Sequence, residues 1–413
     1  MHLATALDID LYDYDFANDP VAVLARLRAE DPVHWSRHGF WFLTRYDDCA
    51  MVLKDAARFS SAAAGWGGDN PLARKDGGAQ SKTEAGLSRN LSQSFNQMDA
   101  PDHTRIRSLV VSAFARRSIE DRRARVVALI DELLDAAAAK GRFDLVTDFA
   151  FHVPIIVASE IIGIAPEDRA QFRDAFAASD ALMAPKRSEE SWAAGLEAAR
   201  WIGRYIRTLI AERRANPRAD LISDLIAAED EHGKLNEAEL ASAVSTIYVA
   251  AGTTTERFIS SGIYLLLAHP EQWRALVADR SLVGPAIDEI LRFHHPLQST
   301  STNRRVTQDM VLRGKQLRAG DTVRVGLGAG NRDPEAFTDP DRFDIFRASP
   351  APFLSFGMGR HFCIGSTLVR FEGELALNAV ADRWPDLKLV TTAPVKDPAR
   401  HDRYLELLVE VPR

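Results

Sequence analysis

A lone cysteine, Cys363, lies in a glycine-rich segment that leads directly into an apolar helical pattern. The chain has one other cysteine, Cys49, so a disulfide framework or a zinc site made of several cysteines has too few thiols. Glycines let the backbone approach a bulky partner closely. The helical pattern after Gly365 places Cys363 at a helix N-terminus, where the dipole favours a thiolate. The alternative is a thiol buried in the core, the usual position of a free cysteine.

The spacing within this segment favours the thiolate. A thiolate in a glycine-lined turn is suited to bind haem iron, and Phe356, Gly359 and Cys363 occupy defined positions in it. The pattern resembles the haem-binding loop of the cytochrome P-450 superfamily. The resemblance implies that heme b is the cofactor and that Cys363 is the axial ligand of its iron. It places further cofactor-binding residues at Phe356, Gly357, His361 and Gly365.

The composition is that of an ordinary globular protein, with 46% hydrophobic and 26% charged residues among 413. The net charge of −7 argues against a general nucleic-acid-binding role. No apolar run reaches the length of a membrane span, and the first residues are acidic, unlike those of a signal peptide. We therefore expect a cytoplasmic protein with no membrane or nucleic-acid partner, similar to bacterial members of the superfamily.

Helical and strand-like patterns occupy different parts of the chain. The helical part covers residues 99–295 and 364–383, and the strand-like part lies mainly in residues 33–60, 297–330 and 387–413. No repeat or proline-rich linker separates these parts. The sequence predicts one mainly α domain over residues 1–413 with a small β-rich region. The resemblance implies the cytochrome P-450 fold, with haem between the long oxygen-binding helix and the helix after Cys363.

Near the N-terminus the patterns predict a helix over residues 21–30, strands around residues 34–35 and 41–43, and a further helix that ends near Phe59. Residues 60–98 are polar and glycine-rich without a hydrophobic period. Such a long segment is typical of a functional or disordered loop.

The longest predicted helix begins after Asn236 and continues to about His269. Asn236 and Glu239 have the spacing of a capping box, in which each side chain bonds the other residue's backbone. Pro270 can begin the next helix as a first-turn proline.

A glycine and three threonines interrupt this long helix. Threonine is a poor helix former, and its hydroxyl can bond back to a carbonyl oxygen and leave space for water or a small ligand. Plain back-bonding in a packed helix is the alternative. The segment resembles the superfamily's oxygen-activating helix, Ala-Gly-x-acid-Thr. The implied catalytic positions are Ala251, Gly252, Thr254 and Thr255.

In this register Thr255 matches the threonine that hydrogen-bonds dioxygen, whereas Thr254 stands where the superfamily usually has an acid. Glu256 does not simply replace that acid, because one helical step turns a side chain by about 100°. Protons can then pass through waters and both threonine hydroxyls, or come from a carboxylate elsewhere. We expect slower or less tightly coupled turnover.

Glu289 and Arg292 are three residues apart in a predicted helix, close enough for an ion pair. The spacing alone carries little weight, since other Glu/Arg pairs of the chain share it and surface pairs contribute little. Their place between the long helix and the cysteine segment resembles the superfamily's Glu-x-x-Arg helix. The resemblance implies a structural role, with Arg342 as the third partner.

Haem carries two propionates, which need cationic or hydrogen-bonding partners. The residues that match the superfamily's positions are His103, Arg107, Arg304 and His361. Each one by itself can be a surface charge or a capping histidine, but we expect the set to contact the propionates. Arg305 lies beside Arg304 and competes for the same role.

The resemblance also assigns a substrate pocket. The pocket residues that it implies are Met183, Ile247, Ala251, Leu297, Gln298 and Ser299. The stretch that begins at Leu297 is unusually polar. Its side chains can bond a substrate hydroxyl or carboxylate, or they can satisfy a β-turn.

These motifs together imply a haem-thiolate monooxygenase that inserts one oxygen atom from dioxygen into a C–H bond of a small, largely apolar substrate. No flavin or iron–sulfur module is apparent in the chain, so electrons would come from a ferredoxin and a ferredoxin reductase that draw on NAD(P)H. A small acidic ferredoxin is expected to dock near Arg105, Arg116 and Arg360. A monomer is the default oligomeric state.

Two alternatives stay open. One is a haem-thiolate enzyme of atypical chemistry, such as oxidative coupling or peroxide-driven oxidation, which Thr254 makes conceivable and Thr255 makes less attractive. The other is a non-catalytic haem protein that binds a ligand, which the threonine segment and the long loop make less attractive still.

Overall fold

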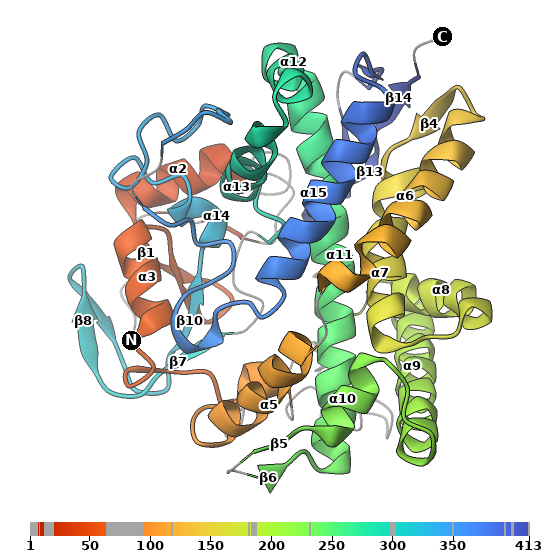
Figure 1. Ribbon diagram of the computed structural model, residues 1–413. Coiled ribbons are helices and arrows are strands. Elements are labelled where there is room, and N and C mark those ends of the chain that lie inside the picture. Colours follow the sequence, from red (N-terminus) through yellow and green to blue (C-terminus); the bar gives the residue numbers. More distant parts are fainter. Residues whose placement is uncertain are drawn as a thin grey trace. The chain divides into compact units, whose positions relative to one another are not determined.

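The computed structural model describes the greater part of the chain (Figure 1). The described residues are 7, 9–11, 20–62, 94–116, 119–180, 182, 188–230, 233–297, 303–348, 351–391, 394–397 and 400–411. The chain is organised as two compact units. Unit 1 consists of Met1–Ser60, Val127–Val153 and Thr254–Arg413, and unit 2 of Ser61–Val126 and Pro154–Thr253. One domain over residues 1–413 stays a prediction.

A five-stranded sheet forms the main β-rich part of unit 1, in the order β1-β2-β10-β7-β3. Its strands are β1 (Val33–Ser36), β2 (Phe40–Leu43), β3 (Phe59–Ser60), β7 (Arg304–Val306) and β10 (Thr322–Val325). Strands β2 and β10 run parallel, with Val323 opposite Trp41, and the other pairs are antiparallel. The indole N–H of Trp41 donates to Asp321 Oδ2 at 2.9 Å, just before β10 begins.

Successive side chains of β2 enter two different cores. Trp41 and Leu43 belong to a cluster that includes side chains of α3 (Tyr46–Lys54), whereas Phe40 and Phe42 pack with side chains of α2 (Pro20–Glu30). This division follows from the alternation of side chains along a strand. All four residues of β2 are therefore buried, and a simple alternation of apolar and polar residues is absent there.

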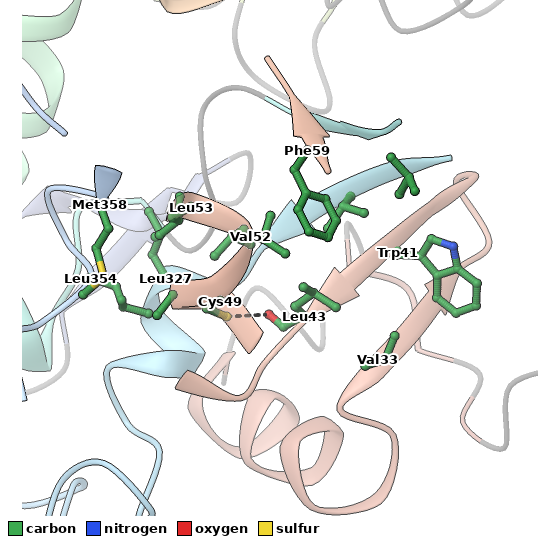
Figure 2. Close-up of a cluster of buried hydrophobic side chains, with 14 of the residues drawn as sticks. Val33, Trp41, Leu43, Cys49, Val52, Leu53, Phe59, Leu327, Leu354 and Met358 are labelled. Atoms are coloured by element: carbon green, nitrogen blue, oxygen red, sulfur yellow. Dashed lines mark hydrogen bonds between the residues drawn. The ribbon is translucent and has the colours of Figure 1, made fainter. Parts of the chain in front are cut away.

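Cys49 of α3 lies in the first of these cores (Figure 2). Its side chain is fully buried, and its Sγ is 3.5 Å from the carbonyl oxygen of Leu43. Burial in these apolar surroundings raises the pKa of the Cys49 thiol well above its usual range. Cys49 is thus a core thiol, the ordinary position of a free cysteine.

The first predicted helix and the first two predicted strands are confirmed as α2, β1 and β2. The prediction of a helix that ends near Phe59 is wrong, because α3 ends at Lys54. The carboxylate of Asp55 accepts hydrogen bonds from the backbone N–H groups of Ala57 and Arg58, at 3.1 and 3.0 Å, and makes a turn there. Phe59 then enters the sheet opposite Val306.

Unit 1 contains further helices, two hairpins and a second sheet. They are α12 (Pro270–Ala278), α13 (Val283–Phe293), α14 (Leu327–Gly330), α15 (Ser366–Arg383), a hairpin of β8 (Met310–Leu312) and β9 (Lys315–Leu317), a hairpin of β12 (Val395–Asp397) and β13 (Arg400–Glu406), and a sheet of β11 (Lys388–Leu389), β14 (Leu408–Glu410) and β4 (Arg142–Asp144). The late strands agree with the β-rich region predicted toward the C-terminus.

Unit 2 is mainly helical. It contains α5 (Asp102–Arg116), α8 (Arg169–Asp180), α9 (Glu189–Ala215), α10 (Leu221–Ala227) and a hairpin of β5 (Glu229–Asp230) and β6 (Gly233–Lys234). Helices α8 and α9 lie side by side (Figure 1). Three helices, α6 (Arg123–Ala138), α7 (His152–Ile162) and α11 (Glu237–Ala268), contribute residues to both units.

The long helix α11 agrees closely with its prediction. The backbone N–H of Glu239 donates to Asn236 Oδ1 at 3.0 Å, and Glu239 Oε2 accepts from the backbone N–H of Asn236 at 2.9 Å, which confirms the capping box. Helix α12 begins at Pro270, as expected of a first-turn proline. The mainly α fold with a small β region is thus confirmed. None of the described helices has the length and apolarity needed to cross a membrane.

A buried ion pair in α13 holds two other segments of unit 1. Glu289 and Arg292 form two parallel hydrogen bonds of 2.8 Å each, with side chains 3% and 2% exposed. Arg292 also donates to the carbonyl oxygens of Asn331 and Pro340, both at 2.9 Å. The charged pair is therefore satisfied by main-chain oxygens as well as by its own carboxylate, as buried charges require.

Asn331 extends this connection toward the cysteine segment. Its Oδ1 accepts from the backbone N–H of Leu354 at 2.6 Å, and its Nδ2 donates to Ser355 Oγ at 2.9 Å. The hydroxyl of Ser355 donates to the carbonyl oxygen of Leu291 in α13 at 2.7 Å. The residues directly before Phe356 are thereby tied to the helix that carries Glu289.

The third partner of Glu289 is Arg347, and the assignment to Arg342 is wrong. The Nε of Arg347 lies 3.1 and 3.3 Å from the two carboxylate oxygens of Glu289. The side chain of Arg342 is 67% exposed and pairs with Asp344 at 2.7 Å. Arg342 contributes its carbonyl oxygen, which accepts from Arg347 at 2.7 Å. The loop that carries both arginines folds back, so the residue five positions later reaches the carboxylate.

We expect Arg347→Ala to be strongly destabilising and Arg342→Ala to be nearly neutral. The first change removes one partner of a buried carboxylate, which costs about 3–5 kcal/mol in comparable sites. The second removes an exposed pair, worth about 0–1 kcal/mol. Urea unfolding of both variants measures the difference. Equal losses would contradict the assignment of Arg347.

Helix α15 contains a buried acid that no described residue neutralises. Glu372 is 1% exposed, and neither carboxyl oxygen has a hydrogen-bond partner among the described residues. Burial raises the pKa of Glu372 well above its usual range. The adjacent Gly373 packs so closely on α11 that a Cβ there would lie 2.4 Å from Cε1 of Phe258. Burial therefore favours the neutral form of the Glu372 carboxyl.

Glu372→Gln is expected to reduce the loss of stability toward alkaline pH. Above the ordinary glutamate pKa of 4.5, the unfolded chain releases a proton that folded Glu372 keeps. The free energy of unfolding of the wild type therefore falls as pH rises, by up to about 1.4 kcal/mol per pH unit until the folded pKa is reached. Thermal unfolding at pH 5 and pH 8 should show a smaller difference in the variant. In the exposed control Glu271→Gln, the difference in stability between the two pH values should equal that of the wild type. An equally large difference in Glu372→Gln would contradict a neutral Glu372 carboxyl.

Candidate functional site

The segment around Cys363 forms a tight turn in unit 1, directly before α15. Gly357 and Gly359 have φ of +68° and +69°, a conformation that glycine adopts without strain. The backbone N–H of Cys363 donates to the carbonyl oxygen of Phe356 at 2.8 Å, which closes the turn. Since α15 begins at Ser366, Cys363 lies beside the first turn of that helix, as predicted.

One glycine of the turn is also required by packing. A Cβ on Gly359 would lie 2.7 Å from the carbonyl oxygen of Leu53 at the end of α3. A Cβ on Gly365 would lie 3.8 Å from Sγ of Cys363, which is an ordinary contact. Gly359 therefore fixes where the turn sits on α3, whereas Gly365 leaves open backbone beside the sulfur.

The two cysteines of the chain occupy different environments. Neither forms a disulfide, but Cys49 is fully buried in a core while Cys363 is only half-buried. The ring of Phe356 is 9% exposed and lies 6.2 Å from the ring of Phe362, and the guanidinium of Arg370 lies 5.5 Å from the Phe356 ring centroid. Cys363 is thus a thiol in a shaped turn with an aromatic ring and a cation nearby.

The donor groups around Cys363 fit an iron whose other ligands come from a cofactor. Within the described part of the chain, no group of three or more His, Cys, Asp or Glu side chains converges on a common point as metal ligands do. A single half-buried thiol can supply one axial ligand to haem, because the macrocycle supplies the equatorial four. The residues present therefore fit haem better than a metal ion held by side chains alone.

The residues predicted for the propionates lie in both units. His103 and Arg107 are four residues apart on α5 in unit 2, and hence on one face of that helix, with His103 1% exposed. Arg304 and His361 lie in unit 1, in β7 and in a short 3₁₀ turn (Gly359–His361). Their joint contact with one haem stays a prediction.

The strand favours Arg304 over Arg305 as the candidate for a propionate contact. Arg304 is 3% exposed and donates to the carbonyl oxygen of Asn303 at 3.2 Å, whereas Arg305 is half-buried. Adjacent strand residues point to opposite faces. The Arg305 guanidinium lies over the turn at Gly320, where a Cβ would be 3.8 Å from it. Arg304 is therefore the inward residue and the better candidate.

The threonine segment of α11 falls at the boundary between the units. Thr254 is half-buried and Thr255 is 1% exposed, and both belong to unit 1. Ile247, Ala251 and the buried Gly252 belong to unit 2. The helix is continuous through these residues, so the prediction that the glycine and the threonines interrupt it is wrong.

In unit 2, Gly252 has a packing role that sequence reasoning missed. A Cβ at this position would lie 2.2 Å from Cζ of Phe176 in α8. Phe176 and Phe172 both pack edge-on against Tyr248 of α11, with ring centroids 5.1 and 4.4 Å away. Glycine at position 252 thus admits an aromatic side chain from another helix, and no local sequence pattern signals that contact.

The predicted pocket residues are only partly described. Leu297 is half-buried, and its backbone N–H donates to Nδ1 of His295 at 2.7 Å. Met183, Gln298 and Ser299 lie outside the described residues. His295 was not predicted as a site residue, yet its Nε2 lies 3.1 Å from the carbonyl oxygen of Ser355. Burial lowers the pKa of His295 to about 4, so it is neutral and links Leu297 to the approach of the cysteine turn.

Comparison with known proteins agrees with this arrangement. A family model for cytochrome P450 matches residues 75–384. The chain is 39% identical to cytochrome P450 monooxygenase PikC of Streptomyces venezuelae over 391 residues, which cover 93% of this chain and 88% of PikC. It is 34% identical to the polyketide biosynthesis cytochrome P450 PksS of Bacillus subtilis (strain 168) over 412 residues, 96% of each chain.

Solved structures show the same similarity. The crystal structure of P450BioI in complex with an acyl carrier protein ligated to hexadec-9Z-enoic acid has a TM-score of 0.85 and 33% identity. The match covers 96% of this chain and 100% of that one. With its cysteine turn, its long threonine-bearing helix and these relatives, the chain belongs to the cytochrome P450 family and is a monooxygenase with haem b as its cofactor.

Proposed function

We propose that the chain inserts one oxygen atom from dioxygen into a C–H bond of a small, largely apolar organic molecule, with electrons from separate redox proteins. The observation that carries this proposal is the Cys363 turn, in which a half-buried thiol outside any disulfide lies beside the start of a helix. A helix N-terminus favours the thiolate, which is the form that binds iron.

On this proposal Cys363 would bind the haem iron through its sulfur, and the ring of Phe356 would shield that sulfur from water. Gly357 and Gly365 leave the backbone open to the macrocycle. The propionates are held by His103, Arg107, Arg304 and His361. When bound, haem supplies the reductive activation of dioxygen, and the thiolate ligand favours cleavage of the O–O bond.

The oxygen side is proposed to depend on α11. The buried hydroxyl of Thr255 can donate a hydrogen bond to dioxygen and hold a proton beside it. Thr254 is half-buried, so its hydroxyl can contact both Thr255 and water. Ala251 and Gly252 complete the catalytic segment. Because Thr254 is not an acid, the proton must enter this chain of hydroxyls from water or from another group.

The names of the relatives support an apolar substrate. PksS is named for polyketide biosynthesis, and P450BioI is seen with a fatty acyl chain on its carrier protein. We propose a substrate with a long apolar part, bounded by Ile247, Ala251 and Leu297. Met183, Gln298 and Ser299 remain part of this proposal, with the amide and hydroxyl available to bond a polar end of the substrate.

Cys363→Ala is expected to abolish the thiolate signature, and Cys49→Ala is expected to retain it. The reduced, carbon-monoxide-bound wild type should show the red-shifted Soret band of thiolate ligation. The Cys49 variant is a matched control because it removes the other thiol of the chain, which lies in a hydrophobic core and is not proposed to bind iron. Difference spectra of the three proteins decide the matter. A red-shifted band that survives in Cys363→Ala would refute the assignment.

The redox partner is proposed to be a small acidic ferredoxin, served by a ferredoxin reductase, that binds near the cysteine turn. Arg360 is exposed there, next to Phe362, which is 43% exposed. Of the other two predicted arginines, Arg105 is paired with Glu239 at 3.3 Å, and the side chain of Arg116 lies outside the described residues. We therefore centre the proposed docking surface on Arg360.

Arg360→Glu is expected to slow reduction by an acidic ferredoxin about 3- to 10-fold at low ionic strength, because charge steering is lost. The loss should shrink as salt rises, since screening acts on exposed charges. Arg318→Glu is the control, because it makes the same charge change at an exposed residue of the β9–β10 turn. Stopped-flow reduction measures the rates. Equal rates for the two variants would contradict docking at Arg360.

A further inference from the structure

Two charged residues follow Thr255 directly on α11, and both are buried. Glu256 is 2% exposed and Arg257 is 1% exposed. Charged side chains are almost never buried to this extent unless they are paired or hydrogen-bonded, because the loss of hydration is costly. The contacts of these two residues therefore decide what their burial achieves.

Glu256 faces the C-terminal hairpin of unit 1. The Nε of Arg403 in β13 lies 3.8 Å from Glu256 Oε2, and its Nη1 lies 4.0 Å from Asp397 Oδ2 in β12. Arg403 is 28% exposed and Asp397 is 17% exposed. One arginine thus joins both strands of the hairpin to the helix, one residue beyond Thr255.

The next residue of the hairpin strengthens this connection. Tyr404 is 5% exposed, and its ring centroid lies 5.3 Å from that of Tyr264 in α11 and 5.5 Å from that of His294. Strand β13 therefore contacts α11 with a charged side chain at Glu256 and an aromatic ring at Tyr264. The hairpin is held to α11 over two helical turns.

Arg257 connects α11 to a second segment. Its Nη1 donates to the carbonyl oxygen of Pro296 at 3.1 Å, directly before Leu297. The consecutive residues Thr255, Glu256 and Arg257 therefore bring together the proposed oxygen site, the C-terminal hairpin and the stretch that follows α13. Because successive side chains turn by about 100° on a helix, the three can face three different neighbours.

We propose that Glu256 is a positioning residue, whose ion pair with Arg403 sets the place of the C-terminal hairpin relative to Thr255. On this proposal the carboxylate of Glu256 pairs with Arg403 and is not the acid that is missing at Thr254. This inference rests on the proposed function, in which Thr255 lies on the oxygen side of haem. The ion pair and the Arg257–Pro296 bond together hold the hairpin and the stretch after α13 to the part of α11 that carries Thr255.

Binding of two iron ligands of different size tests the proposal without turnover. Imidazole is small and contacts little beyond the iron, whereas 4-phenylimidazole reaches the surrounding wall. We expect Glu256→Gln to weaken the binding of 4-phenylimidazole to the ferric protein about tenfold. The affinity for imidazole should stay within about twofold of the wild-type value. Effects of this size are typical of residues that do not contact the ligand themselves. Absorbance titration gives both dissociation constants.

Arg403→Gln should reproduce the Glu256→Gln result, and the double variant should lose no more than either single one, because both changes remove the same interaction. Arg403→Lys keeps the charge and should recover most of the loss. Glu410→Gln is the matched control, since it breaks an exposed pair with Arg142 of similar length, 3.9 Å. It should leave both ligands unaffected.

Several results would overturn the inference. One is that Glu256→Gln binds 4-phenylimidazole as tightly as the wild type does. A second is that the losses of affinity add up in the double variant. A third is a loss in Glu256→Gln that Arg403→Gln does not share, which would assign Glu256 a separate role such as proton donor. The carbon monoxide spectrum separates this from the proposed function. A wild type without the thiolate band refutes haem-thiolate ligation itself, whereas variants that keep the band but show unchanged ligand ratios refute only the positioning role.

Discussion

The buried carboxylate of Glu289 is the interaction on which the cysteine turn depends. Arg292 and Arg347 neutralise it, and Arg292 also binds the main chain at Asn331. Asn331 in turn bonds the residues directly before Phe356. A charge in a low-dielectric interior must be paired and hydrogen-bonded, so this requirement fixes the path of the chain into the turn. Apolar packing alone tolerates small shifts, whereas a bidentate ion pair has one geometry.

The two cysteines show how different surroundings give the same type of side chain different properties. Cys49 lies in a closed core, where burial raises the pKa of its thiol and keeps it protonated. Cys363 lies half-buried beside the start of α15, in a turn that positive-φ glycines permit. A helix N-terminus and open backbone favour a thiolate that can bind iron. The same chain thus provides one thiol closed in a core and one thiol that is proposed to bind iron.

Helix α11 is held by packing contacts both before and after its threonines. In unit 2, Phe176 fills the space that the missing side chain of Gly252 leaves. In unit 1, Glu256 and Arg257 contact the C-terminal hairpin and Pro296. Poor helix formers such as the threonines between these contacts are tolerated because tertiary packing, not propensity, supplies most of the stability of a helix in a protein. The surroundings of these threonines are therefore shaped by neighbours distant in sequence.

Features set by neighbouring residues could be predicted, because spacing along one element fixes their geometry. The capping box at Asn236, the bidentate Glu289–Arg292 pair and the position of Cys363 before α15 are of this kind. The end of α3 was missed because one turn-forming aspartate, Asp55, outweighed a helical pattern.

The sequence by itself thus determined the family and the helix that carries Thr255 and predicted Cys363 as the haem ligand, since each rests on a short motif. Only the tertiary structure decided which arginine completes the Glu289 site, why position 252 is glycine and where the carboxylate of Glu256 goes. Each of these depends on how a distant loop, helix or hairpin returns to the site. Local spacing constrains side chains within one element, but contacts between elements are set by the packing of the whole unit.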